Sequence, residues 1–413
     1  MEIKSRLTVL NFLQFFVWGS WLISIGNYLG GTLHFSGSQI GAVFSTLGIA
    51  SLFMPTLMGI VADKWINTER VLGICHIVGA ALLFYSSTIS DPTEFFWVML
   101  LNSMFYMPTI ALNNSVSYTI LEQKGFDVVK DFPPIRVWGT IGFIAAMWIV
   151  DFCGWTSSNM QLIFSSASAL LLGIYALTLP QCPPVKSTKD GSFFSLIGLD
   201  AFVLFKQQKM FVFFLFAMFL GAALQITNAF GGSFLESFKT THPDSFGVKH
   251  SNLLLSISQI SETLFILTIP FFLRKFGIKK VMLMSIFAWV LRFGLFAFGN
   301  PGNGLYLLLL SMVIYGMAFD FFNISGSLFV EKETSANMRA SAQGLFMFMT
   351  NGIGAMAGGY CSGLVVDHFT KNDVRDWQSI WLTFAAYALV LGIIFPLVFK
   401  YKHNPKTVEN FNH

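Results

Sequence analysis

The chain has 413 residues, of which 54% are hydrophobic and 11% are charged, and its formal net charge is +4. This composition lies far outside the usual balance of soluble globular proteins and predicts a membrane protein. In a soluble chain a net charge of +4 could indicate nucleic-acid binding. Here lysines in the loops between apolar stretches explain the excess, so we expect no nucleic-acid partner.

Twelve apolar stretches are each long enough to cross a bilayer, because a spanning helix needs about 20 mostly apolar residues. In the first half, the predicted spans are residues 7–29, 39–60, 71–90, 95–117, 135–153 and 161–180. In the second half, they are residues 208–231, 251–273, 280–299, 304–328, 338–366 and 377–399. The first stretch is too long for a signal peptide and lacks its cleavage site, so we interpret it as a membrane helix.

The basic residues lie mostly on one side of these spans. Twenty of the 25 Lys and Arg residues fall in loops on the side shared by both termini. The opposite loops hold only Lys239, Lys249, Lys371 and Arg375. Cytoplasmic loops carry an excess of Lys and Arg, so both termini are predicted to be cytoplasmic. The asymmetry also supports the number of spans, because one missed or extra helix would destroy it.

The longest loop on the terminal side divides the chain into six spans and six. The predicted organisation is an N-terminal six-helix bundle at 1–180, a linker at 181–207, a C-terminal six-helix bundle at 208–400 and a tail at 401–413. The linker residues Leu196 to Phe205 are apolar enough to lie along the membrane surface as a short helix.

Two short charged turns occupy equivalent places in the two halves. One links spans 2 and 3 at residues 59–70, and the other links spans 8 and 9 at residues 274–280. Such correspondence is typical of a duplicated six-helix unit. The turns resemble the cytoplasmic loop motif of the major facilitator superfamily, although ordinary basic loops would also produce charged turns.

Several kinds of chemistry are not supported by any motif. The chain has no Gly-Lys dipeptide and therefore no phosphate-binding loop, which excludes an ATP-driven pump within this chain. No catalytic motif is present, so we expect no enzyme. The cysteines Cys75, Cys153, Cys182 and Cys361 have no metal-binding spacing, and the seven histidines form no cluster. We expect neither a metal nor another cofactor.

Ionisable residues inside predicted spans are costly and usually mark a functional site. Glu262, Arg292 and Asp320 lie well inside spans 8, 9 and 10. We expect Arg292 to pair with Asp320 or with another buried acid. Arg136 stands at the start of span 5, directly after Pro133-Pro134, where proline suits the first turn of a helix.

Helical spacing gathers further polar and aromatic residues near these charges. The groups are Arg136, Thr140 and Phe143 in span 5, Gln225 and Asn228 in span 7, Gln259 and Glu262 in span 8, and Tyr315 and Phe319 in span 10, with Asp320 and Asn323 close by. Within each group, the residues are three, four or seven positions apart. Residues at these separations lie on the same face of a helix. A single polar residue could simply form a hydrogen bond that holds two helices together, with no role in binding a ligand. Four such faces favour a central polar cavity.

The residue types in this predicted cavity indicate the ligand. Amides and a carboxylate suit a ligand rich in hydroxyl groups, because together they supply donors and acceptors. Phe143, Tyr315 and Phe319 offer flat faces for a ring, although any single Phe could instead contact lipid. Stacking of a base on an aromatic ring contributes about 1–3 kcal/mol. A sugar joined to an aromatic base would use both kinds of group.

Several long motifs resemble the bacterial nucleoside permeases of the nucleoside:proton symporter family. They are Phe12-Leu13-Gln14-Phe15 with Trp18-Gly19-Ser20-Trp21, Asp131 to Thr140, Leu224 to Asn228, Ile257 to Glu262, and Ala318 to Gly326. The similarity extends over nearly the whole chain. It implies an all-α membrane protein with twelve transmembrane helices, a major facilitator fold of two six-helix bundles, and uptake of nucleosides such as uridine or adenosine with protons. The resemblance also implies a cavity lined by Arg136, Thr140, Phe143, Gln225, Asn228, Gln259, Glu262, Tyr315 and Phe319.

The sequence therefore predicts a proton-coupled nucleoside importer of the cell inner membrane. One alternative is a sugar or oligosaccharide:proton symporter of the same fold, and another is a membrane receptor or scaffold that transports nothing. Proton coupling needs a titratable group at membrane depth. We favour Asp320 because it points away from the face that would contact the ligand, with Glu262 as the alternative. A purely structural Asp320–Arg292 pair is the third possibility.

Overall fold

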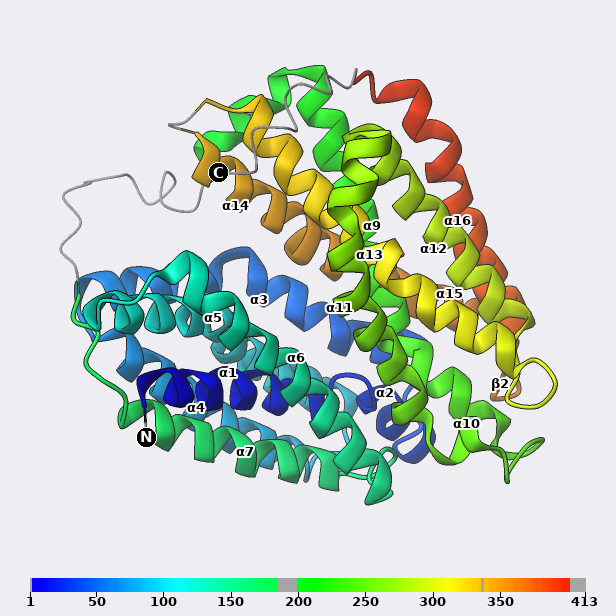
Figure 1. The fold of residues 1–413 in the computed structure, drawn as a ribbon. Helices are drawn as coiled ribbons and strands as arrows, with labels where there is room; N and C mark the ends of the chain where they lie inside the picture. Colours follow the sequence, from blue (N-terminus) through cyan, green and yellow to red (C-terminus); the bar gives the residue numbers. More distant parts are fainter. Residues whose placement is uncertain (1, 185–198, 336–337, 402–413) are drawn as a thin grey trace. The chain divides into compact units, whose positions relative to one another are not determined.

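The computed structural model describes residues 2–184, 199–335 and 338–401. The chain divides into two compact units, Met1–Gly191 and Ser192–His413, which we call the N-terminal and C-terminal units. Figure 1 shows that long helices dominate both. Among the described residues, ten helices are long and apolar enough to cross a membrane, and each falls on a predicted span. Much of the predicted linker and nearly all of the predicted tail lie outside the described residues.

The N-terminal unit is entirely helical in its described part. Its elements are α1 (Ile3–Gly19), α2 (Ile25–Asn27), the π-helix η1 (Tyr28–Thr32), α3 (Gly37–Lys64), α4 (Thr68–Ser86), α5 (Pro92–Gln123), α6 (Val128–Phe152) and α7 (Met160–Leu177). The predicted first span, 7–29, is therefore interrupted after Gly19. Residues 20–24 form turns, in which the Ser24 hydroxyl donates to the Gln161 side-chain carbonyl at 2.8 Å. Apolar composition alone did not reveal this interruption.

Short polar side chains at the helix starts satisfy backbone N–H groups that have no partner within the helix. Ser36 and Gln39 form a capping box at the start of α3, with the Gln39 N–H donating to the Ser36 hydroxyl at 3.2 Å. Asp91 accepts from the Glu94 N–H at 2.8 Å at the start of α5. Asp127 accepts from the Val129 N–H at 2.9 Å and so fixes the start of α6.

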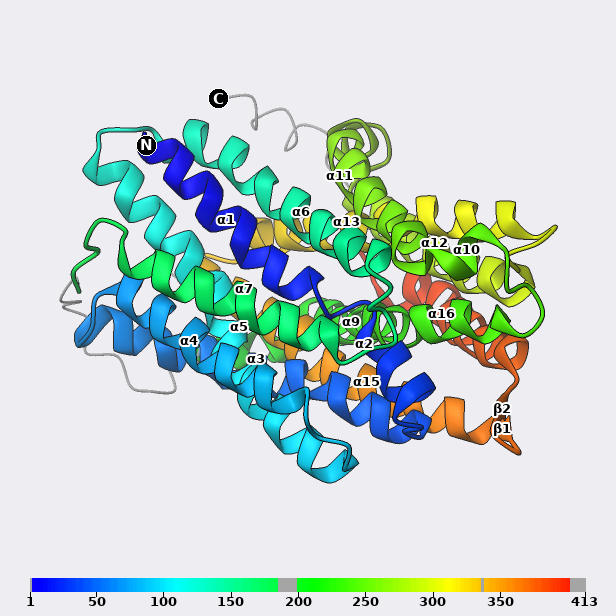
Figure 2. The ribbon, with the colours of Figure 1, turned by 90° about the horizontal axis from the view of Figure 1, so that it is seen from below.

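Helix α1 lies between α6 and α7, as Figure 2 shows, and it contacts both along much of its length. Glycines allow the contact with α6 to be close. A Cβ atom at Gly19 would lie only 2.8 Å from the Phe143 Cα, and one at Gly142 would lie 3.1 Å from the Phe12 Cα. Small residues at such crossings let membrane helices approach backbone to backbone. Two of the segments that carry predicted motifs are thereby held together.

The C-terminal unit is also helical apart from one short hairpin. Its elements are the 3₁₀-helix η2 (Leu199–Lys206), α9 (Gln208–Glu236), the 3₁₀-helix η3 (Ser237–Lys239), α10 (Phe246–Lys249), α11 (Ser251–Phe276), α12 (Ile278–Phe298), α13 (Leu305–Glu333), α14 (Arg339–Met347), the π-helix η4 (Phe348–Gly354), α15 (Ala355–His368), β1 (Thr370–Lys371), β2 (Val374–Arg375) and α16 (Trp377–Val398). Helix α12 packs on both α13 and α16, and α11 packs on α13. The described part of the predicted linker helix is η2.

The predicted span at 338–366 is helical, but it is divided into α14, η4 and α15. Helix α9 packs closely against this segment. A Cβ atom at Gly221 of α9 would lie 2.8 Å from the Thr350 carbonyl carbon, and one at Gly358 would lie 2.5 Å from the Ala222 Cα. The π-helical turn lies at this contact. A wide π turn inside an α-helix often occurs at functional positions.

The hairpin of β1 and β2 departs from the all-helical expectation. Thr370 pairs with Arg375 and Lys371 pairs with Val374 in an antiparallel register. Asn372 and Asp373 form its turn with φ values of 49° and 61°. Asn and Asp tolerate this left-handed conformation better than other residues with a side chain, so a two-residue turn closes at this point.

Candidate functional site

Helix α6 carries the predicted site residues of the N-terminal unit. Because α6 begins at Val128, Pro133 and Pro134 lie in its second turn, and our expectation that they open the helix was wrong. The Asp127 cap starts the helix earlier than the apolar pattern indicated. Arg136, Thr140 and Phe143 nevertheless lie on one continuous helix and keep the expected spacing.

The guanidinium of Arg136 lies over the ring of Phe15 on α1, with 4.0 Å between the guanidinium carbon and the ring centroid. A cation at this distance is attracted by the negative face of an aromatic ring. Gly139 leaves room for the pair, because a Cβ atom there would lie 2.6 Å from the Phe15 ring and 2.7 Å from Arg136 Nη1. The charge of Arg136 is thus held against α1.

Phe143 is buried, and its backbone lies against Gly19. Its ring meets Trp18 edge-on, with 6.3 Å between the centroids and 90° between the planes. Trp18 in turn lies 5.5 Å from the ring of Tyr106 on α5. Three aromatic side chains from α1, α5 and α6 therefore form a continuous set, of which the sequence pattern had singled out only Phe143.

In the C-terminal unit, α9 carries the two predicted amides. The Asn228 side-chain N–H donates to the Gln225 side-chain carbonyl at 3.1 Å, as their separation of three residues allows. Gln225 is buried and Asn228 is half-buried. This arrangement leaves the second N–H of Asn228 and its carbonyl oxygen for other hydrogen bonds.

A close crossing of α11 and α13 brings the other four predicted residues together. A Cβ atom at Gly316 of α13 would lie 2.6 Å from the Ser261 carbonyl oxygen and 2.8 Å from the Glu262 nitrogen. The Ser261 hydroxyl also donates to the Val313 carbonyl oxygen and accepts from the Gly316 N–H. These contacts fix the two backbones side by side at the level of Glu262.

Tyr315 is the centre of this group. Its ring stacks on Phe319, with centroids 6.2 Å apart and planes 8° from parallel. Gln259 and Glu262 both lie close enough to its hydroxyl to interact with it. The C-terminal unit therefore brings Gln259, Glu262, Tyr315 and Phe319 into one cluster, which combines an amide, a carboxylate, a phenol and a ring face.

The expected pairing of Arg292 with Asp320 was wrong. Arg292 Nη1 donates to the Ser311 carbonyl oxygen at 2.9 Å and to the Ser258 hydroxyl at 3.4 Å. Its guanidinium carbon lies 4.5 Å from the Tyr315 ring centroid. Within the described residues no ion pair joins it to an acid. Neutral acceptors and a ring face are its contacts because α12 turns it toward α11 and the early part of α13, and its buried Nε has no hydrogen-bond partner among the described residues.

Asp320 is buried on α13, with 3% of its surface exposed. Its Oδ2 atom has no hydrogen-bond partner among the described residues. The Glu262 carboxyl lies within electrostatic range of it. Two carboxyl groups thus lie within range of each other's field, and the unpaired buried oxygen of Asp320 disfavours the charged form of that residue.

Sequence reasoning missed a network of buried polar side chains in the N-terminal unit. Gln14 is its centre: its carbonyl oxygen lies 2.8 Å from His76 Nε2, and its side-chain nitrogen donates to the Thr109 hydroxyl at 2.7 Å. The Tyr106 hydroxyl donates to the Gln14 backbone carbonyl at 2.9 Å. One turn away, Asn113 donates to Asn11 at 2.8 Å. The isolated amides and the histidine within apolar stretches were the available signal.

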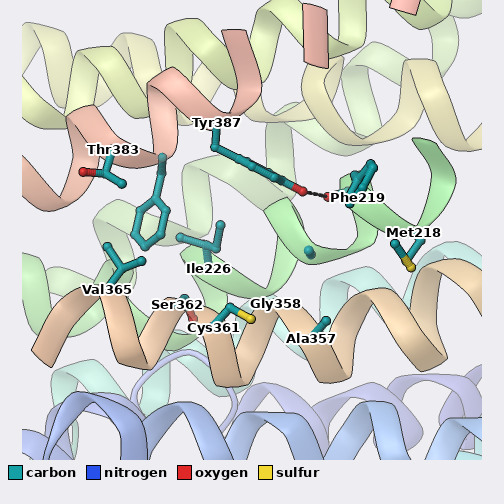
Figure 3. A pocket seen from close by; sticks show the side chains of 12 residues that line it. Met218, Phe219, Ile226, Ala357, Gly358, Cys361, Ser362, Val365, Thr383 and Tyr387 are labelled. Carbon is teal, nitrogen blue, oxygen red and sulfur yellow. Dashed lines mark hydrogen bonds between the residues drawn. The ribbon is translucent and has the colours of Figure 1, made fainter. Parts of the chain in front are cut away.

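A separate pocket of about 310 Å³ lies between α9, α15 and α16 of the C-terminal unit (Figure 3). Its walls are mostly apolar, and the Tyr387 hydroxyl beside it donates to the Phe219 carbonyl oxygen at 2.8 Å. None of the predicted site residues lines it. A pocket without amides or carboxylates does not suit a ligand rich in hydroxyl groups.

Comparison with known proteins identifies the family. Residues 1–404 match the family described as Nucleoside H+ symporter. The chain is 56% identical over 413 residues to the xanthosine permease of Escherichia coli K12, covering 99% of each chain. It is 55% identical over 406 residues to the nucleoside permease NupG of the same organism, covering 98% of this chain and 97% of the relative.

A solved structure gives the same result. The crystal structure of the nucleoside transporter NupG superposes with a TM-score of 0.92 at 55% identity, covering 97% of this chain and all of the other. The match to the family extends over both units, and the relatives are membrane transporters. The chain is therefore a multi-pass membrane protein that belongs to the nucleoside:H⁺ symporter family, which is a family of transporters and not of enzymes.

Proposed function

We propose that this protein imports nucleosides together with protons across the cell inner membrane by alternating access. The observation that carries the proposal is the cluster of Gln259, Glu262, Tyr315 and Phe319 at membrane depth, beside the buried and unpaired carboxyl oxygen of Asp320. Binding groups for a polar aromatic ligand thus lie next to a candidate proton carrier. The family match agrees with this chemistry and favours neither the sugar symporter nor the non-transporting receptor.

The proposed ligand contacts divide between the sugar and the base. Gln225, Asn228 and Gln259 hydrogen-bond the ribose hydroxyls, because amides can both donate to and accept from them. Phe143 or Phe319 stacks on the base. Arg136, Thr140, Glu262 and Tyr315 complete the contacts. We propose nucleosides, such as uridine or adenosine, as substrates, and the names of two relatives as a nucleoside permease and a xanthosine permease support this class of ligand.

We propose Asp320 as the proton carrier, with Glu262 as the alternative. The Oδ2 atom of Asp320 has no hydrogen-bond partner among the described residues. Protonation would stabilise the buried side chain, because the neutral acid needs no cationic partner. Arg292 does not neutralise it, since its contacts are with Ser311, Ser258 and Tyr315. Glu262 lies within electrostatic range of both Asp320 and Tyr315. Protonation of Asp320 can therefore affect ligand binding at Tyr315, and ligand binding can affect protonation of Asp320.

We further propose the finer organisation of the fold. The segments α1–η1 and α14–η4–α15 are the two remaining spans, which with the ten long helices make twelve in two six-helix bundles. The bundle boundaries are those expected from the sequence, 1–180 and 208–400, with a linker at 181–207 and a tail at 401–413. Both termini are cytoplasmic, because the basic residues are concentrated on that side.

Uptake of radiolabelled uridine into proteoliposomes, with and without an imposed pH gradient, tests the proposed function. Accumulation should exceed equilibration only when the outside is more acidic than the inside. Equilibration that ignores the gradient would refute proton coupling. Binding without any uptake would instead favour a receptor, and competition by sugars but not by uridine would favour the sugar symporter.

A further inference from the structure

The last turn of α1 presents an indole group that the proposed ligand contacts do not include. Trp18 lies edge-on to Phe143 at 6.3 Å and tilted against Tyr106 at 5.5 Å. It is followed at once by Gly19 and by the interruption of the helix. Membrane transporters commonly build substrate sites where a spanning helix is discontinuous. Trp18 therefore lies at the interruption of a predicted span and beside Phe143, a proposed contact of the base.

The Trp18 indole N–H is buried and has no hydrogen-bond partner among the described residues. A buried tryptophan N–H usually has a partner, and leaving one unpaired disfavours the folded state. The neighbouring polar groups are already in use. Gln14 contacts His76 and Thr109 through its side-chain amide and Tyr106 through its backbone carbonyl. The nearby network therefore leaves the indole N–H as an unused donor.

The network also holds the indole in place. Tyr106, against which Trp18 packs, is fixed by its hydrogen bond to Gln14, and its ring meets His76 edge-on at 6.1 Å. Gln14, His76 and Thr109 are buried, so these hydrogen bonds are protected from water. A donor held by such a scaffold loses little conformational freedom when it binds an acceptor.

We propose that Trp18 is a further substrate-binding residue, whose indole N–H donates a hydrogen bond to an acceptor atom of the nucleobase, which in uridine is one of the two base carbonyl oxygens. The proposal rests on the proposed function, specifically on contact between Phe143 and the base. An indole N–H can only donate, so its partner on the ligand must be an acceptor. The ring lies beside Phe143, a proposed contact of the base, so the base supplies the acceptor. Gln14, His76 and Tyr106 are positioning residues for this donor.

Trp18→Phe keeps an aromatic ring and removes the N–H. Trp381→Phe is the matched control, because the Trp381 indole N–H is also buried and unpaired. Trp381 lies on α16, where it stacks against Phe293 at 6.0 Å in an aromatic cluster. Both variants remove an unpaired donor from an aromatic environment, but only Trp18 adjoins a proposed base contact.

Isothermal titration calorimetry on the purified full chain measures the affinity for uridine. We expect Trp18→Phe to bind uridine about tenfold more weakly, which is the loss of one hydrogen bond to the ligand. Trp381→Phe should bind uridine within about twofold of the unchanged protein. Equal affinities in the unchanged protein and Trp18→Phe would overturn the proposal.

Two uridine analogues, each lacking one of the two base carbonyl oxygens, identify the acceptor. For one of them, the unchanged protein and Trp18→Phe should bind with equal affinity, because the hydrogen bond is absent in both cases. Ratios of affinities measured on one preparation do not depend on its folded fraction, so partial unfolding of a variant cannot imitate this result. If Trp18→Phe weakens uridine and both analogues by the same factor, the proposal is overturned.

The same titrations separate this proposal from the proposed function. An unchanged protein that does not bind uridine would refute the proposed substrate and the role of Trp18 together. An unchanged protein that binds uridine, with no difference between it and Trp18→Phe, would refute the role of Trp18 alone.

Discussion

Replacing Gly316 by alanine tests whether the crossing of α11 and α13 builds the candidate site. The added Cβ would lie 2.6 Å from the Ser261 carbonyl oxygen, 2.7 Å from the Ser261 carbonyl carbon and 2.8 Å from the Glu262 nitrogen. All three are backbone atoms, so no side chain can rotate away to relieve the contact. One helix must move relative to the other.

The size of the movement follows from these distances. Ordinary van der Waals contact begins near 3.4 Å, so the two helices must separate by about 0.8 Å at this level. Overpacking of this kind typically lowers the free energy of unfolding by about 1–3 kcal/mol. The separation also moves Glu262 and Gln259 away from Tyr315, with which both interact. We therefore expect a lower melting temperature and a weaker affinity for uridine.

Gly294→Ala is the matched control. Gly294 lies within α12, and a Cβ atom there would meet nothing within 4 Å. The same chemical change at Gly294 should leave stability equal or slightly higher, because alanine favours the helix more than glycine does. Thermal unfolding in detergent, followed by tryptophan fluorescence, and calorimetry with uridine measure both quantities. If Gly316→Ala matches Gly294→Ala in melting temperature and in uridine affinity, the close crossing does not position the site.

Four further predictions concern single residues. Gln225→Ala should weaken uridine binding about tenfold in calorimetry, because it removes a proposed ribose contact and the acceptor of a neighbouring amide, and an unchanged affinity would contradict the assignment. Arg136→Lys keeps the charge but loses the planar fork and its contact with Phe15, so uptake of radiolabelled uridine should fall, and full uptake would leave only a topological role. Asp320→Asn should retain nucleoside binding and lose uphill uptake driven by a pH gradient. Accumulation at the unchanged rate would show that another acid carries the proton. Burial, followed by the nearby Glu69 charge, raises the pKa of the Cys182 thiol to about 12, so at pH 7 it is almost wholly protonated and should resist maleimide, which reacts with the thiolate. Its labelling should stay slow as the pH is raised from 7 to about 8.5, where an ordinary cysteine thiol is half ionised, and rapid labelling at pH 7 would show that the segment after α7 opens.

The sequence determined the class of the protein and the approximate place of ten of its spans. This was possible because a bilayer imposes a local rule: backbone groups in lipid must be paired within a helix, so each span appears as a long apolar stretch. Local spacing also predicted which residues share a helix face. Gln225 and Asn228 were expected three residues apart on one helix, and their side chains are hydrogen-bonded.

Contacts between helices were decided only by the tertiary structure. The expected partner of Arg292 was an acid, but the rotation of α12 turns it toward Ser311, Ser258 and the Tyr315 ring. The network around Gln14 depends in the same way on three helices meeting at one level, which no spacing within one helix encodes. The interruption after Gly19 was hidden because the apolar pattern continues across it, through Trp21, Leu22 and Ile23. The lipid around each segment sets how apolar that segment must be, so each span can be recognised from its own residues. The rotation, crossing and interruption of helices depend instead on packing between segments that are distant in the chain.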